Sequence, residues 1–169
     1  MLISITEPAE NLHLGIYKIG EGREEEKRGA RELLKAMLGY EVEIRHNSDG
    51  KPVIPGFNIS ISHTKGYVAV LLSAVFKVGI DIEYHSGRIQ KIARRFLRPD
   101  EIYSQSIDLL TVWCVKETLY KLRSEEHLTY QEMLVDVENT KVSDLKADDE
   151  LEYKIFDYGD FLLTMAWEI

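Results

Sequence analysis

The chain is poor in cysteine, in long hydrophobic runs and in positive charge relative to negative charge. Its single cysteine, Cys114, excludes a disulfide within the chain, which is typical of proteins from a reducing compartment. The longest apolar stretch, residues 68–76, contains Ser73 and is far too short to cross a bilayer. Residues 1–7 lack the basic flank and the cleavage signal of a secretory peptide. We therefore expect a cytoplasmic protein that does not associate with a membrane.

The excess of acidic residues also limits the kinds of partner. The chain has 29 Asp and Glu residues against 21 Lys and Arg residues, which gives a formal net charge of −8 at pH 7. Proteins bind the nucleic-acid backbone mainly through clustered Lys and Arg, so we expect no nucleic-acid partner. A chain of 169 residues, 44% of them hydrophobic, can bury roughly two-thirds of its unfolded surface. This size is compatible with one domain and with two closely packed lobes.

Periodicity and turn residues predict an alternation of strands and helices, and hence an α+β fold. In the first half, apolar spacing predicts a helix over residues 23–38 that ends at Gly39, with strands at 2–5, 12–19, 58–62 and 67–72. In the second half, it predicts a strand at 78–83, helices at 88–97 and 107–122, and closing strands near 133–142, 151–157 and 161–169. The turn at residues 157–160 joins the last two strands into a hairpin.

A short segment, residues 78–83, places two carboxylates on one face of a strand. The apolar residues Ile80 and Ile82 occupy alternate positions, and alternate positions of a strand point to opposite faces. Asp81 and Glu83 therefore point the same way. We expect one apolar face and one acidic face.

A second segment, residues 113–121, presents a third carboxylate and a lysine on one side of a helix. Trp113, Glu117 and Lys121 follow one another at intervals of four residues, which places them on the same helix face. If the fold brings Glu117 beside the strand carboxylates, each close pair repels by about 4 kcal/mol at an effective dielectric near 20. Such a cluster calls for a cation, and oxygen ligands favour Mg²⁺ with a phosphate ester as substrate. The alternative is a solvated strand face beside an ordinary Glu117–Lys121 helix pair, worth about 0.2–0.5 kcal/mol.

Five segments, taken in order, resemble those of the 4'-phosphopantetheinyl transferases: Gly50-Lys51-Pro52, Ser60-Ile61-Ser62-His63, Gly79-Ile80-Asp81-Ile82-Glu83, Phe96-Leu97 with Glu101, and Trp113-Cys114-Val115-Lys116-Glu117 with Lys121. The chain is more similar to the two-lobed surfactin-synthetase type than to the short, trimeric holo-acyl-carrier-protein synthases. The resemblance implies two pseudo-symmetric lobes, each with a small, mostly antiparallel sheet packed on a helix. Residues 1–74 would form the lobe that contacts coenzyme A. Residues 75–169 would hold the metal site, the catalytic helix and the carrier-docking surface, and we expect a monomer.

The resemblance implies a Mg²⁺-dependent enzyme that transfers the 4'-phosphopantetheine arm of coenzyme A to a serine of an acyl or peptidyl carrier protein and releases adenosine 3',5'-bisphosphate. Position by position, Asp81, Glu83 and Glu117 would bind Mg²⁺. Three residues would be catalytic: Glu101, Glu117 and Lys121. Glu101 would take the serine proton. Lys121 would bridge the phosphate, with Lys116 nearby. The phosphates and adenine of coenzyme A would be held by Lys51, Pro52, Ser62 and His63.

A run of basic residues that follows the acidic strand is the predicted docking surface for an acidic carrier protein: Arg88, Lys91, Arg94, Arg95 and Arg98. The alternative is a solvated helix face. The basic residues of the first helix could bind the ribose phosphate of coenzyme A; they are Arg23, Lys27, Arg28 and Arg31. Glutamates interleave with them, so a solvated helix face is an equal alternative. Two other functions stay open, a Mg²⁺-dependent phosphoester hydrolase and a relative that binds coenzyme A without turnover. The residues do not identify the carrier protein or the acyl groups tolerated on coenzyme A.

Overall fold

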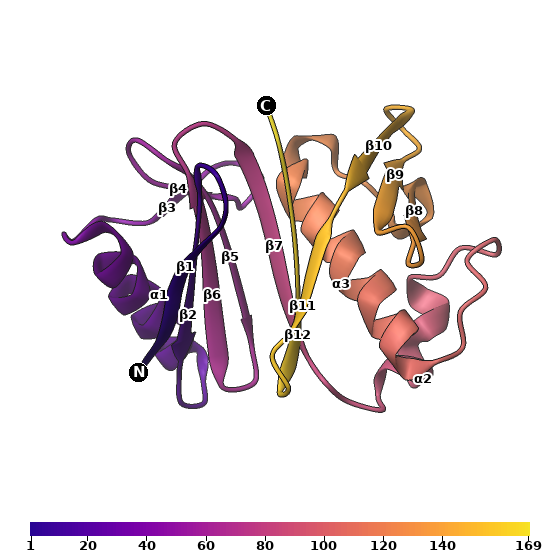
Figure 1. The fold of residues 1–169 in the computed structure, drawn as a ribbon, viewed down its shortest axis with the longest axis horizontal. Coiled ribbons are helices and arrows are strands. Elements are labelled where there is room, and N and C mark those ends of the chain that lie inside the picture. The colour runs from indigo at the N-terminus through magenta and orange to yellow at the C-terminus, as the bar shows by residue number, and fades with distance from the viewer.

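The chain folds into two lobes, each built from a small antiparallel sheet packed on one long helix (Figure 1). A computed structural model describes all residues, 1–169. Every strand pair runs antiparallel. The α+β class predicted from the sequence is therefore confirmed.

The N-terminal lobe is a four-stranded sheet with one helix on its face. The strands follow the order β1 (Leu2–Ala9), β2 (Leu12–Lys18), β6 (Tyr67–Ser73) and β5 (Asn58–Thr64). Helix α1 (Arg23–Leu38) buries Ala30, Leu33 and Leu34, which have the spacing of a single helix face. Gly39 ends the helix in the left-handed conformation, as predicted. Two short strands follow α1 in the chain, β3 (Arg45–His46) and β4 (Pro52–Val53).

The C-terminal lobe contains two three-stranded sheets and the second long helix. One sheet has the order β11 (Lys154–Asp157), β12 (Phe161–Glu168) and β7 (Lys77–Tyr84). The other has the order β10 (Asp149–Glu152), β9 (Lys141–Asp144) and β8 (Met133–Asp136). Helix α3 (Ser106–Leu122) packs on β7 and β12, and shorter helical turns are α2 (Ile89–Ile92), η1 (Ala93–Arg95), η2 (Ser124–Glu126) and η3 (Tyr130–Glu132). None of these helices combines the length and the apolar character needed to cross a membrane.

Helix α3 approaches β7 closely because the strand carries a glycine at the crossing point. A Cβ atom on Gly79 would lie 2.4 Å from the carbonyl oxygen of Thr118 and 2.9 Å from Cβ of Leu122. Only a residue without a side chain permits this packing. The same face of β7 carries Asp81 and Glu83, so both carboxylates point toward the helix. The acidic face of the strand is thus covered rather than open to solvent.

The two lobes share an apolar core and are also joined by a row of hydroxyl groups. The shared core includes Leu12, Leu14 and Leu71 from one lobe and Ile80, Ile82 and Leu163 from the other. Along the seam between β5 and β7, the hydroxyls of Ser60, Ser62 and Thr64 accept hydrogen bonds from the backbone N–H groups of Ile80, Ile82 and Tyr84 at 3.1, 3.0 and 3.0 Å. Side chains of β5 therefore replace the backbone acceptors of a neighbouring strand.

The predicted helix over residues 88–97 is wrong in its extent. The chain forms one α-helical turn, α2, and one 3-10 turn, η1. Beyond them, the carbonyl of Phe96 accepts a hydrogen bond from Lys116 Nζ, and that of Leu97 accepts one from Gln131 Nε2. Because these carbonyls bind side chains of other segments, they do not continue a helical ladder.

Two of the three predicted closing strands are also wrong, since each is divided in two. Residues 133–142 contain all of β8, a turn and the start of β9, with Thr140 in the left-handed region at φ 52°. Residues 151–157 contain the end of β10 and all of β11, which belong to different sheets. Between them, the buried Tyr153 donates its N–H to the carbonyl of Thr140. Tertiary packing, rather than local sequence, sets this break.

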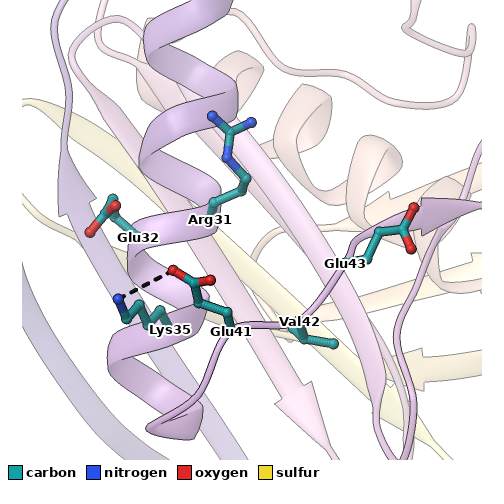
Figure 2. Close-up of a pocket in the computed structure, with 6 residues that line it drawn as sticks. All are labelled: Arg31, Glu32, Lys35, Glu41, Val42 and Glu43. Carbon is teal, nitrogen blue, oxygen red and sulfur yellow. Dashed lines mark hydrogen bonds and ion pairs between the residues drawn. The ribbon is translucent and has the colours of Figure 1, made fainter.

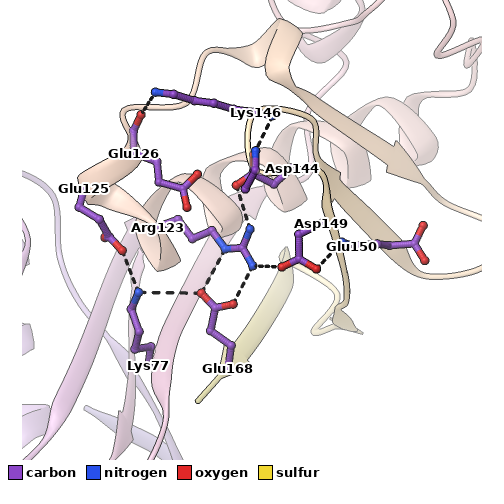
Figure 3. Close-up of polar contacts among 10 residues, drawn as sticks. Lys77, Arg123, Glu125, Glu126, Asp144, Lys146, Asp149, Glu150 and Glu168 are labelled. Carbon is purple, nitrogen blue, oxygen red and sulfur yellow. Dashed lines mark hydrogen bonds and ion pairs between the residues drawn. The ribbon is translucent and has the colours of Figure 1, made fainter.

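At the end of α3, Arg123 ties the helix to the last strand and to the smaller sheet (Figure 3). The side chain is only 6% exposed, and its guanidinium donates to Asp144 at 2.8 Å, to Asp149 at 2.6 Å and to Glu168 at 2.7 Å. A buried guanidinium is stabilised only when such partners compensate its charge. This network holds the C-terminal end of α3 against β12 and β9.

Candidate active site

Asp81 lies at the centre of the site, where the two lobes meet, and it is 3% exposed. Its Oδ1 accepts hydrogen bonds from Ser62 Oγ on β5 at 3.0 Å and from Lys121 Nζ on α3 at 2.8 Å. Its Oδ2 is buried and has no hydrogen-bond partner. An unpaired carboxylate oxygen is costly to bury, so Asp81 is suited to bind a cation through this oxygen.

Two glutamates lie near Asp81, and an aromatic side chain holds each of them. Trp113 Nε1 donates to Glu83 Oε1 at 2.8 Å, and the Tyr130 hydroxyl donates to Glu117 Oε1 at 2.9 Å. Burial and the charge of Asp81 raise the pKa of Glu83 to about 9. The same two causes raise the pKa of Glu117. The fold therefore brings the three carboxylates within electrostatic reach of one another.

The predicted three-carboxylate metal site is not preformed. No group of three or more His, Cys, Asp or Glu side chains lies close enough together to hold a metal ion. The physical reason is that each carboxylate turns one oxygen toward a protein donor, which relieves the repulsion among them. Each nevertheless keeps one oxygen that accepts no hydrogen bond from the protein, namely Oδ2 of Asp81 and Oε2 of Glu83 and Glu117. Carboxylate oxygens are the ligands that a hard divalent cation such as Mg²⁺ prefers, so these residues suit such an ion in their chemistry although not in their present spacing.

The structure does not support the predicted roles of Glu101 and Lys116. Glu101 is 5% exposed; its Oε1 accepts hydrogen bonds from Lys116 Nζ at 2.6 Å and from the Arg98 N–H at 2.8 Å. Its Oε2 accepts one from the Val135 N–H at 2.8 Å. Lys116 has no exposed side-chain surface and also donates to two backbone carbonyls. The two residues form a buried ion pair, and neither lines the cavities described below.

A cavity of about 250 Å³ opens beside Glu117 and Lys121. Its opposite wall is the turn at residues 49–52 of the N-terminal lobe, which contains Lys51 and Pro52. Burial lowers the pKa of Lys51, although the charge of Glu125 acts in the opposite direction. The structure thus brings the turn that was predicted to bind coenzyme A next to the face of α3 that carries Glu117 and Lys121.

A second cavity, of about 620 Å³, continues this space along α1. It shares Gly50, Pro52 and Ile61 with the first cavity, so the two form one groove. Its lining includes five basic side chains: Arg23, Lys27, Arg31, His46 and His63. His63 is exposed and lies 3.4 Å from Glu26, measured from Nδ1 to Oε1. Two of the predicted coenzyme ligands point elsewhere: the Ser62 hydroxyl is directed at Asp81, and Lys116 is paired with Glu101.

A third pocket, of about 360 Å³, lies between α1 and residues 41–43 (Figure 2). Lys35 and Glu41 form an ion pair there at 3.3 Å, with their side chains 54% and 82% exposed. Exposed pairs of this kind contribute little to stability or binding. Of the residues that the sequence analysis singled out, Arg31 alone lines this pocket.

A sequence model of the 4'-phosphopantetheinyl transferase superfamily matches residues 77–162, which is more than half of the chain. The chain belongs to this superfamily. Its members use coenzyme A as a substrate and act on carrier proteins, typically with a divalent metal. The match covers β7, α3 and η3, whereas the N-terminal residues that line the groove, including Lys51 and His63, lie outside it. A search of curated proteins found no significant match.

In this member of the superfamily, the predicted docking residues lie on and around α2 and η1. Arg88, Lys91, Arg94 and Arg95 are exposed. Arg98 is engaged instead, since its guanidinium pairs with Asp100 at 2.9 Å and donates to the carbonyl of Gln131. The free basic surface is therefore smaller than the sequence predicts.

Sequence reasoning missed Tyr130, which holds Glu117. Tyr130 lies eight residues beyond α3 and belongs to none of the five motif segments. One signal was present, because Thr129 and Glu132 have the spacing of a capping box. That spacing predicts a helical turn at this point, but it does not show where the tyrosine points.

Proposed function

We propose that this protein is a Mg²⁺-dependent 4'-phosphopantetheinyl transferase of the two-lobed surfactin-synthetase type. It would transfer the phosphopantetheine arm of coenzyme A to a serine of an acyl or peptidyl carrier protein and release adenosine 3',5'-bisphosphate. One observation carries the proposal: Asp81, Glu83 and Glu117 each have one oxygen held by a protein donor and one oxygen without a donor. An enzyme that binds a cation against a pyrophosphate needs such an arrangement.

The metal would be held by the donor-free oxygens of Asp81, Glu83 and Glu117, and when bound it would neutralise charge on the pyrophosphate. Lys121 adds a second positive charge beside Asp81. Burial works against this charge, but Asp81 raises the pKa of Lys121 and so keeps it protonated. A phosphoryl transfer asks the protein chiefly for alignment and for positive charge near the leaving oxygens. Lys121 would supply that charge to the leaving group.

The groove supports a role in binding coenzyme A. Lys51 and Pro52 lie next to Glu117 and Lys121, so a pyrophosphate between them would be near the metal ligands. The adenosine bisphosphate end would extend along α1, where basic side chains balance an otherwise acidic protein: Arg23, Lys27, Arg31, His46 and His63. Ser62 would act indirectly, since it orients Asp81.

The proton of the attacking serine needs an acceptor other than the buried Glu101. Glu117 lines the cavity beside the coenzyme turn and is only partly covered. We propose that one water carries the proton to Glu117 Oε1, since Oε2 would hold the metal. The resemblance to the two-lobed type leads us to propose a monomeric enzyme.

The deciding experiment is an intact-mass measurement of an apo carrier protein incubated with this protein, coenzyme A and Mg²⁺. We expect the carrier to gain one phosphopantetheine group on a serine. Glu117→Gln should reduce the rate by at least about a hundredfold, the range for loss of an acid–base group. The matched control is Glu138→Gln, on an exposed residue without side-chain bonds, which should act like the wild type. Hydrolysis of coenzyme A without a carrier, or binding without turnover, would refute the proposed transfer.

We further propose that Arg88, Lys91, Arg94 and Arg95 dock the carrier protein, mainly through the association rate. The double substitution of Arg94 and Arg95 by Glu should raise the KM for the carrier at low salt and leave the KM for coenzyme A unchanged. A carrier KM equal to that of the wild type would refute the docking surface.

A further inference from the structure

Tyr130 contacts Glu117 of helix α3, although Tyr130 itself lies in η3. Its hydroxyl donates to Glu117 Oε1 at 2.9 Å, and its ring packs on Trp113 with centroids 5.4 Å apart. Trp113 in turn donates to Glu83 Oε1 at 2.8 Å and packs edge-on against Phe96 at 5.0 Å. Trp113 and Tyr130 therefore present one donor to each of the two glutamates from a cluster of three packed aromatic rings.

The backbone of Tyr130 is held in place by three other segments of the lobe. Its carbonyl accepts a hydrogen bond from Lys116 Nζ at 2.9 Å. The next residue, Gln131, donates from its side chain to the carbonyl of Leu97 at 3.0 Å and accepts a hydrogen bond from Arg98 on its own carbonyl. The turn also contains a capping box, in which the Thr129 N–H donates to the Glu132 carboxylate at 2.9 Å. The phenol oxygen is thus fixed by the fold, not by Glu117 alone.

We infer that Tyr130 is a positioning residue that, together with Trp113, turns one oxygen of each glutamate away and leaves the other directed at a divalent cation. The inference rests on the proposed function, because it concerns the same carboxylates. Groups that orient metal ligands typically change metal affinity by 10- to 100-fold when they are removed. Two aromatic donors on one stack would couple the orientations of Glu83 and Glu117.

The test is the dissociation constant of Mn²⁺ alone, measured by electron paramagnetic resonance, which does not depend on turnover. Tyr130→Phe keeps the ring stack and removes only the hydroxyl, and we expect Mn²⁺ to bind at least about tenfold more weakly. Trp113→Phe, which removes the donor to Glu83, should weaken binding in the same direction.

The matched control is Tyr103→Phe. This variant also removes a tyrosine hydroxyl, which donates to the carbonyl of Val135 and accepts from the N–H of Val137. That hydroxyl makes no hydrogen bond to Asp81, Glu83 or Glu117. We expect a similar change in Tm for the two Tyr variants and an unchanged Mn²⁺ affinity for the control.

The outcomes separate this inference from the proposed function. If Glu117→Gln weakens Mn²⁺ binding while Tyr130→Phe stays within twofold of the wild type, the positioning role is refuted and the metal site stands. If the wild type and Glu117→Gln bind Mn²⁺ equally, or neither binds it, the metal site is refuted and the positioning role with it.

Discussion

The Lys116–Glu101 ion pair allows a direct test of whether Lys116 stabilises the fold or binds coenzyme A. We consider Lys116→Met, which keeps the length of the side chain and removes its charge. In the folded protein, this change deletes hydrogen bonds from Nζ to Glu101 Oε1 at 2.6 Å, to the carbonyl of Phe96 at 2.6 Å and to that of Tyr130 at 2.9 Å. Because both side chains are fully buried, no water replaces the lost donor.

The magnitude follows from the unpaired carboxylate that remains. Glu101 would keep the N–H groups of Arg98 and Val135 but lose its only countercharge. Removal of one partner of a buried ion pair costs about 3–5 kcal/mol. For a protein of this size, that loss corresponds to a decrease in Tm of roughly 6–20 °C. It would be a large part of a total stability of about 5–15 kcal/mol.

Urea unfolding followed by circular dichroism measures this loss directly. A double-mutant cycle with Glu101→Gln should show an interaction energy within about 0.5–3 kcal/mol, because the two side chains are in contact. Lys146→Met is the matched control, since Lys146 is exposed and donates only to the carbonyl of Glu126. A Lys116→Met variant within about 1 kcal/mol of the wild type, but with a raised KM for coenzyme A, would refute the structural role.

Two further predictions concern the packing and the charges that hold α3. Gly79→Ala should destabilise the protein by at least about 1–3 kcal/mol, because the added Cβ would lie 2.4 Å from a backbone oxygen of α3. The control is Gly87→Ala, whose Cβ meets no atom within 4 Å and which should have little effect in the same urea assay. A hydrogen bond from Arg123 lowers the pKa of Asp149 below its usual value of 3.8. This carboxylate therefore stabilises the folded state fully above about pH 4, and its contribution is lost as the pH falls through the folded-state pKa. Asp149→Asn should therefore lower the urea midpoint at pH 6, and by progressively less as the pH falls below about 4, whereas Asp148→Asn should leave the midpoint unchanged throughout. A difference between Asp149→Asn and the wild type that grows with acid would contradict this reasoning.

Much of the fold could be predicted because several elements carry strong local signals. The spacing of Ala30, Leu33 and Leu34 with a glycine at the end fixes α1, and the alternation around Asp81 fixes β7. The region after α3 was harder, since its strands are short and Tyr153 turns the chain from one sheet to another through a tertiary hydrogen bond. Local periodicity contains no information about such a contact.

The candidate site could be predicted in its elements but not in its side-chain directions. Helical spacing correctly places Glu117 and Lys121 on the side of α3 that faces β7. The neighbouring Lys116 points to the other side of the helix and into the lobe, so adjacency in a motif says little about a shared site. Tyr130 comes from a separate turn, and no spacing rule relates it to α3.

Strand β5 shows how one short motif serves two parts of the site. Successive residues of a strand point to opposite faces, so Ser62 and His63 cannot both contact the same ligand. Ser62 faces the seam, where it joins the N–H of Ile82 to the carboxylate of Asp81. His63 faces the groove along α1. The same strand therefore forms a wall of the groove proposed for coenzyme A and fixes the carboxylate proposed for the metal, and a change in the position of β5 would affect both at once.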